Sequence, residues 1–128
     1  MSENRSPAHP LAAYKELIDQ LASETSHGVT ERIVLEKGAF LERSDDAVYN
    51  TLLKSLTIEE KGMLARLIHN ERISAIHDVL ALLTWWINAR GLGFTFRGDA
   101  MPFDLSGMGL HGDYVGRLDG WNWPDQTA

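Results

Sequence analysis

The sequence of 128 residues contains no cysteine. Without a thiol, the chain forms no disulfide bond and offers no thiolate for catalysis or for a zinc or iron–sulfur site. It also has no long hydrophobic run, because its most apolar stretch, residues 79–87, is about half as long as a membrane span. Residues 1–10 are polar and do not resemble a signal peptide. We therefore predict a cytoplasmic protein that does not enter a membrane.

The chain also has no surplus of positive charge. Acidic residues outnumber basic ones by 18 to 12, which gives a formal net charge of −6. Proteins that bind nucleic acid or anionic membranes need an excess of Lys and Arg to neutralise phosphate groups. We therefore predict that neither is a partner.

Apolar residues are plentiful, at 44% of the sequence, and the length is typical of one domain. We predict a single domain over residues 1–128. A loose arm over 1–9 precedes a helical bundle over 10–90. A tail rich in glycine and tryptophan, residues 91–128, then packs back on the bundle.

Helical periodicity is clear in the first part of the chain. Apolar residues three and four positions apart after Pro10 predict a helix that Gly28 ends. Residues 29–42 fit either a short helix capped by Thr30 or a short strand. Polar residues at 44–46 predict the start of another helix. The expected buried face of that helix is Val48, Tyr49, Leu52, Leu53 and Leu56.

A capping box begins at Thr57 and predicts the start of a further helix. Residues 58–90 carry two apolar stripes that point about 110° apart around a helix axis. Either the chain breaks near Asn70, or one long helix changes its packing partners part-way. Residues 79–87 are apolar except for Thr84, so we predict that this segment is the buried central helix of the bundle.

The composition changes after this helix. Eight of the eleven glycines lie within residues 91–120. Residues 94–96 predict a short strand, with which residues 114–118 can pair. Trp121 and Trp123 carry large apolar surfaces, so we expect the tail to fold back on the bundle.

Two parts of the chain resemble a known family. Residues 64–67 read Leu-Ala-Arg-Leu, with Glu-Arg at 71–72 and Ala-Ile-His-Asp-Val-Leu at 75–80. Residues 110–121 read Leu-His-Gly-Asp-Tyr-Val-Gly-Arg-Leu-Asp-Gly-Trp. Together they resemble a small bacterial family described as a domain of unknown function. The resemblance implies a bacterial cytoplasmic protein and carries no assigned activity.

Residues 107–112 read Gly-Met-Gly-Leu-His-Gly, a literal G-x-G-x-x-G motif. In dinucleotide-binding proteins this motif follows a strand, opens a helix and precedes an acidic residue about twenty positions on. Residues 101–106 are poor strand formers, and too few residues follow for the rest of that unit. We therefore predict a glycine-rich turn and no cofactor.

Catalytic and metal-binding patterns are weak. No His-x-x-x-His or Glu-x-x-His spacing places two ligands on one helical face, so we expect no metal. His77 and Asp78 are adjacent and point about 100° apart on a helix. We predict that Asp78 is a buried or half-buried acceptor for backbone N–H groups of the tail. Ser74 has no visible orienting acid, and Ser106 lacks the G-x-S-x-G elbow.

The tail carries charges of both signs. Arg97 and Arg117 can hold a carboxylate or phosphate together, or can pair within the chain. We favour pairing with the aspartates of the tail, which are Asp99, Asp113 and Asp119.

These observations predict a mainly α fold. It is a compact bundle of four or five helices around a central apolar helix, with a glycine-rich C-terminal segment that can form a short β-hairpin. The favoured function is a non-catalytic protein-interaction or regulatory module, with a homodimer as one form. Its surface is the tail and the region of Trp85 and Trp86, at least one of which we expect in the core.

The alternative is an enzyme or a small-ligand binder. Its site lies between the central helix and the C-terminal tail, where polar residues concentrate beside a rigid element. The candidate residues are His77, Asp78, Arg97, His111, Asp113 and Arg117.

Overall fold

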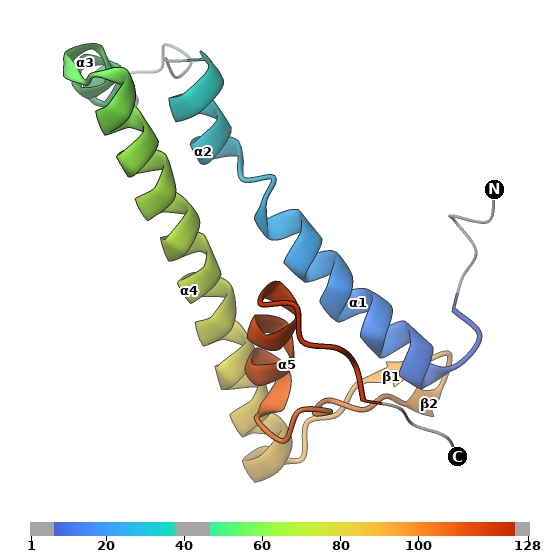
Figure 1. The fold of residues 1–128 in the computed structure, drawn as a ribbon. Coiled ribbons are helices and arrows are strands. Elements are labelled where there is room, and N and C mark those ends of the chain that lie inside the picture. The colour runs from blue at the N-terminus through green and yellow to red at the C-terminus, as the bar shows by residue number, and fades with distance from the viewer. Residues whose placement is uncertain (1–6, 38–46, 125–128) are drawn as a thin grey trace. The chain divides into compact units, whose positions relative to one another are not determined.

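Helices make up most of the chain in the computed structural model, which describes residues 7–37 and 47–124 (Figure 1). The elements in order are α1 (Pro10–Thr25), α2 (Val29–Arg32), a π-helical turn (Ile33–Lys37), α3 (Ala47–Ser55), α4 (Ile58–Arg90), β1 (Thr95–Phe96), β2 (Asp99–Ala100) and α5 (Gly109–Leu118). The mainly helical class and the short hairpin near the C-terminus are therefore confirmed.

Contacts within the chain form two compact units. Unit 1 comprises Met1–Ser23 and Ala75–Ala128, and unit 2 comprises Glu24–Ser74. Residues 1–6 of the predicted arm, residues 38–46 and residues 125–128 lie outside the described part of the chain.

The predicted first helix is confirmed as α1, and Pro10 occupies its first position, where a missing N–H leaves no hydrogen bond unmade. Tyr14 and Ile18, four residues apart, are fully buried. The prediction that Gly28 ends this helix is wrong, because α1 already ends at Thr25. Gly28 has an extended backbone and is the N-cap of α2.

Unit 2 has a small hydrophobic core. Val34, Leu53 and Ala65 are buried there, with Leu64 and Ile68 packed against them. Val34 belongs to the helical stretch over 29–37, so of the two options left open by the sequence the structure has the helix. Thr30 lies inside α2 and does not cap it.

The predicted helix after residue 46 is confirmed as α3, although its expected cap at 44–46 lies outside the described residues. Its expected buried face is wrong in part. Leu53 is buried, whereas Val48, Tyr49 and Leu52 are about half exposed. A helix of nine residues presents little of its circumference to the core of unit 2, so the flanks of its apolar face stay open.

The capping box at the start of α4 is confirmed. The backbone N–H of Thr57 donates to Glu60 Oε1 over 2.8 Å, and the N–H of Glu60 donates to Thr57 Oγ1 over 3.1 Å. The helix continues without a break for 33 residues, so the option of a break near Asn70 is not realised. No helix within the described residues is both long enough and apolar enough to span a membrane.

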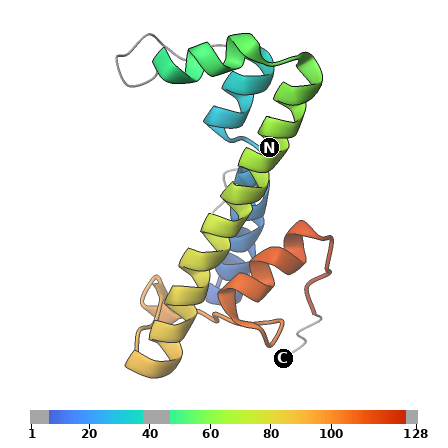
Figure 2. The same ribbon diagram turned by 90° about the vertical axis from the view of Figure 1, so that its left-hand side faces the viewer.

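The prediction that residues 79–87 form a buried central helix is wrong. Leu80 and Thr84 are buried, but Val79 and Leu82 are each 58% exposed. The segment is apolar around its whole circumference, and α1 and α5 cover only one side of it. Figure 2 shows its other side with no element in front of it.

The hairpin is shorter than expected and pairs differently. β1 and β2 are antiparallel, with Thr95 opposite Ala100 and Phe96 opposite Asp99. Arg97 and Gly98 connect them, and both have positive φ, at 53° and 86°. Two such residues are typical of a tight turn between twisted strands. The expected pairing with residues 114–118 is wrong, because those residues lie in α5.

α5 packs between α1 and the C-terminal part of α4 within unit 1 (Figure 1). Its residues Leu110 and Tyr114, four positions apart, are buried on one face. The chain after α5 then returns to α1, where the Trp123 indole N–H donates to Asp19 over 3.1 Å. This hydrogen bond holds the end of the described chain against α1.

Candidate functional site

Asp113 is the most completely buried charged group among the described residues. Its Oδ2 accepts the Tyr14 hydroxyl at 2.5 Å and the N–H of Leu105 at 2.8 Å. Its Oδ1 accepts the N–H of Ser106 at 2.8 Å. These three donors compensate for burying the carboxylate and join α1 to the loop before α5.

The Tyr14 hydroxyl is held in its neutral form by the same arrangement. Burial raises the pKa of Tyr14 well above its ordinary value, and the hydrogen bond to Asp113 raises it further. Tyr14 is therefore a proton donor to Asp113 and does not act as a base. Both oxygens of Asp113 already accept hydrogen bonds. The Tyr14–Asp113 pair therefore has a structural role, because it links α1 to α5.

Arg117 has a second set of contacts with α1. Its Nε donates to Asp19 Oδ1 over 2.6 Å, and its Nη1 donates to the carbonyl of Trp121 over 2.5 Å. The guanidinium also lies 5.1 Å from the centre of the Trp123 ring. The partner expected for Arg117 was an aspartate of the tail, and that choice is wrong: the aspartate belongs to α1.

The glycine-rich motif has a packing role. Gly107 and Gly109 have φ values of 86° and 83°, a region that side chains other than glycine rarely adopt. A Cβ on Gly109 would lie 2.7 Å from Thr84 Cγ2. The adjacent N–H of Leu110 donates to Thr84 Oγ1 over 3.0 Å, so α5 starts directly against α4. No strand precedes the motif within residues 101–106, and α5 already begins at Gly109. The prediction of a turn over residues 107–112 is therefore wrong for its last four residues, which are helical.

His77, Asp78 and His111 form one group of neighbours. The two imidazole rings are 5.0 Å apart and perpendicular, and His77 Nδ1 lies 3.2 Å from Asp78 Oδ1. The prediction that Asp78 is a buried acceptor for the tail is wrong, because its side chain is 80% exposed. The residue with that role is Asp113.

The six candidate residues therefore do not share one site. His77, Asp78 and His111 lie together at α4 and α5, Asp113 and Arg117 contact α1, and Arg97 lies in the hairpin turn with its guanidinium 5.0 Å from the Phe96 ring. Within residues 7–37 and 47–124, no three His, Asp or Glu side chains are grouped closely enough to hold a metal ion.

A pocket of about 450 Å³ does exist in unit 1, bounded by α1, α4, β1 and α5. Its wall is almost entirely apolar, with Leu17, Leu83, Phe94 and Met101 among its residues. None of the six candidates lines it. The hollow between helix and tail is thus present, but the polar chemistry expected there is not.

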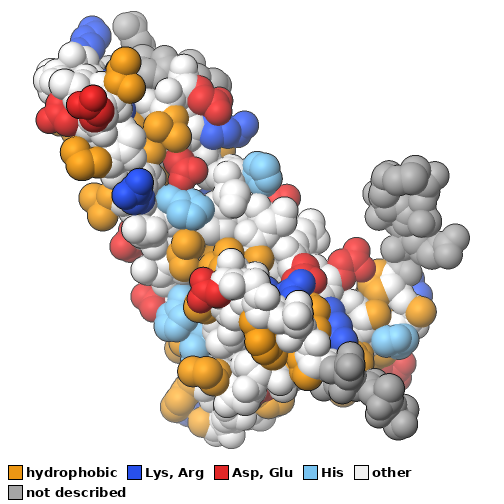
Figure 3. Space-filling view, viewed as in Figure 1, with side chains coloured by type: hydrophobic (Ala, Val, Ile, Leu, Met, Phe, Trp, Pro, Cys, Tyr) orange, Lys and Arg blue, Asp and Glu red, His pale blue; other side chains and the backbone are white. Residues whose placement is uncertain are grey.

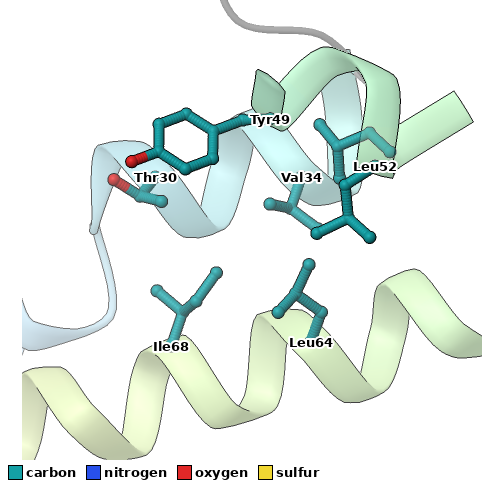
Figure 4. A pocket seen from close by; sticks show the side chains of 7 residues that line it. Thr30, Val34, Tyr49, Leu52, Leu64 and Ile68 are labelled. Atoms are coloured by element: carbon teal, nitrogen blue, oxygen red, sulfur yellow. The ribbon is translucent and has the colours of Figure 1, made fainter. Parts of the chain in front are cut away.

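Unit 2 has its own apolar pocket of about 510 Å³. Figure 4 shows Leu64 and Ile68 pointing from α4 toward Val34 and Leu52, with the hydroxyls of Thr30 and Tyr49 at one end. No sequence-predicted site residue lies in it. Its lining has no acidic or basic side chain, and the two hydroxyls are its only polar side-chain groups.

The exposed side of α4 in unit 1 carries a row of apolar side chains. We call it the outward stripe. It consists of Ala75, Val79, Leu82, Trp86 and Ala89, all exposed and spaced alternately four and three residues apart. This is the spacing of a helix face that packs against another helix. Figure 3 shows hydrophobic side chains along the left-hand edge over this part of α4.

Two tryptophans lie on and beside the outward stripe. Trp85 is 51% exposed and Trp86 is 43% exposed, so the expectation that at least one is in the core is wrong. Their rings contact each other edge to face at 6.0 Å, and the Arg90 guanidinium lies 5.5 Å from both. Stacking of this kind restrains the side chains before any partner binds.

Sequence reasoning singled out the Trp85 and Trp86 region but assigned Val79 and Leu82 to the core. The heptad spacing of the stripe is visible in the sequence and places these two residues on one face, but it does not say whether the rest of the chain covers that face.

A family model described as "Family of unknown function (DUF6547)" matches residues 7–125. The chain belongs to this family. The resemblance to a domain of unknown function is therefore confirmed, and it covers nearly the whole sequence. No curated protein and no solved structure matches the chain.

Proposed function

We propose that this chain is a non-catalytic protein-interaction module of a bacterial cytoplasm, and that the outward stripe of α4 is its docking surface. The observation that carries the proposal is the row of exposed apolar side chains at heptad spacing. The resemblance found in the sequence supports the bacterial origin, and the absence of cysteine supports the reducing compartment.

The free energy available at this surface is consistent with docking. Covering Val79, Leu82, Trp85 and Trp86, each about half exposed, contributes on the order of 3–6 kcal/mol. Association itself costs about 4–15 kcal/mol in lost freedom of motion. The stripe is therefore sufficient only for a partner that covers it well and uses the tryptophans as anchors, as interfaces commonly do.

The contacts of the former catalytic candidates support a non-catalytic role. Asp113 accepts three hydrogen bonds, and Arg117 is engaged with Asp19 and a backbone carbonyl. A nucleophile, a base and an orienting group within mutual reach are the minimum for hydrolytic or transfer chemistry. The six residues do not provide that set.

The proposal is tested by a photo-crosslinking amino acid placed at Leu82 and, as a matched control, at Asn88, which is exposed on another side of the same helix. We expect a discrete crosslinked species in cells from position 82 and none from position 88. Trp86→Asp in the Leu82 variant should remove that species. The same crosslinks from both positions, or none from Leu82, would contradict the proposal.

A second candidate function is favoured by the apolar pocket of unit 1. Its volume of about 450 Å³ is within the usual range for a small-molecule site, and its wall suits an uncharged apolar ligand. We expect N-phenyl-1-naphthylamine, an apolar fluorescent probe, to bind there and Met101→Trp to reduce binding by filling the space. Equal binding to the variant would exclude the pocket as the site.

A further inference from the structure

We infer that the partner of the outward stripe is a second copy of this chain, paired antiparallel about a two-fold axis near Leu80 and Ala81 of α4. This inference rests on the proposed function, because it uses the same surface. It adds the identity of the occupant and the register in which it binds.

The sizes of the side chains along the stripe select the antiparallel direction. In heptad packing, an antiparallel partner places each residue of the stripe opposite the other type of heptad position. Ala75 then lies opposite Trp86 of the second copy, and Val79 lies opposite Leu82 of the second copy. The small residue faces the large one in the two layers formed by Ala75 and Trp86, and two residues of middle size face each other in the two layers between them.

A parallel pair packs less well. It would place Trp86 opposite Trp86 and Ala75 opposite Ala75, so one layer is overfilled and another leaves a void. Both overpacking and voids are unfavourable in a close-packed interface. The antiparallel pair also aligns the helix dipoles favourably.

Polar groups beside the stripe complement each other in the same register. Asp78 and Trp85 occupy the same flank of the helix, seven residues apart. In the antiparallel pair this flank faces its own copy, so Asp78 of one chain lies beside Trp85 of the other. Asp78 is 80% exposed and can accept the indole N–H. The symmetry makes this contact twice.

The charge of the segment also permits self-pairing. The chain as a whole has a net charge of −6, which opposes association of two copies in general. Residues 75–90, however, contain one acidic and one basic residue, Asp78 and Arg90. The stripe therefore selects no strongly charged partner, and a two-fold pair buries it on both copies at once.

The test uses the absence of cysteine in the sequence, which makes any introduced thiol unique. Ala75→Cys and Ala89→Cys are mild changes at exposed positions. In the antiparallel register, a thiol at position 75 of one chain and a thiol at position 89 of the other are offset by only ~4–5 Å along the axis, whereas the two thiols of an Ala75→Cys pair are offset by ~16 Å. A parallel pair reverses this pattern, with ~21 Å between positions 75 and 89.

The two variants are mixed and treated with a short bismaleimide. One of them carries ¹⁵N, so that a mixed dimer is distinguished by mass from a dimer of either variant alone. We expect mixed dimers and no dimers of either variant alone. Leu82→Asp introduced into both variants should abolish the mixed product. Crosslinks of Ala75→Cys with itself would overturn the antiparallel arrangement.

Absence of any crosslink, with a mass that stays at 14.3 kDa at high concentration, would overturn self-pairing. If Leu82 still crosslinks in cells in that case, the proposed docking surface stands with a different partner. If both signals are absent, the proposed function fails as well.

Discussion

Two faces of the same segment of α4 have similar side chains and different surroundings. Leu80 and Thr84, on the inward face, are 7% exposed, whereas Val79 and Leu82 are 58% exposed. Leu80 has α1 and α5 beside it, whereas the opposite side of this part of α4 has no element in front of it (Figure 2). Apolar character alone therefore does not identify the core: a helix that is apolar all round can have one face packed within the fold and the other face exposed.

The largest loss of stability is expected at Asp113, which joins α1 to the loop before α5. Asp113→Ala removes the acceptor of three buried hydrogen bonds and leaves the Tyr14 hydroxyl and two backbone N–H groups without partners. We expect the free energy of unfolding to fall by about 3 kcal/mol or more. Urea unfolding followed by circular dichroism measures it.

The matched control for that change is Asp119→Ala, because Asp119 is exposed at the end of α5. It should change stability by less than about 0.5 kcal/mol. A similar small loss for Asp113→Ala would mean that the buried carboxylate is not a structural fastening.

The comparison itself is tested by truncating one leucine on each face. Leu80→Ala creates a cavity beside α1 and α5, so we expect a loss of about 2–4 kcal/mol in the free energy of unfolding of the isolated chain. Leu82→Ala, measured at a concentration where the chain is monomeric, should cost less than about 1 kcal/mol. Equal losses at the two positions would contradict the assignment of an inward and an outward face.

The smallest predicted change in stability is the one that Tyr14 causes at alkaline pH. Because the pKa of Tyr14 is raised in the folded chain by burial and by Asp113, Tyr14 ionises first in the unfolded chain. Its contribution to stability is present below its ordinary pKa of about 10 and falls above it, by up to about 1.4 kcal/mol per pH unit. Tyr14→Phe removes this dependence. The measurement is the free energy of unfolding of both proteins between pH 9 and 11. An equally steep fall with pH in the two proteins would exclude this contribution of Tyr14.

Local signals allowed much of the helical structure to be predicted from the sequence. The capping box at Thr57 and Glu60 involves residues three apart, and both of its hydrogen bonds are present. The apolar spacing after Pro10 likewise gave α1. Such patterns depend on neighbours along one helix, so they can be recognised before the tertiary structure is known.

Contacts between distant parts of the chain could not be predicted in the same way. Tyr14 and Asp113 are 99 residues apart in sequence, and nothing local distinguishes Asp113 from Asp78 as the acid that the fold buries. The role of buried acceptor was consequently assigned to Asp78 and belongs to Asp113. Residues 114–118 were similarly predicted as a strand from short-range pattern, although the burial of Leu110, Asp113 and Tyr114 follows helical spacing.

The outward stripe could be predicted from the sequence only in part. Its heptad spacing is present in the sequence, but periodicity gives the faces of a helix without saying which face the rest of the chain covers. Which face is covered depends on α5. This helix starts against Thr84 through Gly109 and Leu110 and so covers the inward face.

The most direct measurement is the mass of the purified chain by light scattering over a wide range of concentration, together with that of Leu82→Asp. We predict that the mass of the unaltered chain rises from 14.3 kDa toward twice that value, while Leu82→Asp stays at 14.3 kDa and keeps its helical circular dichroism. An unaltered chain that remains at 14.3 kDa throughout, or a Leu82→Asp chain that associates equally well, would contradict pairing through the outward stripe.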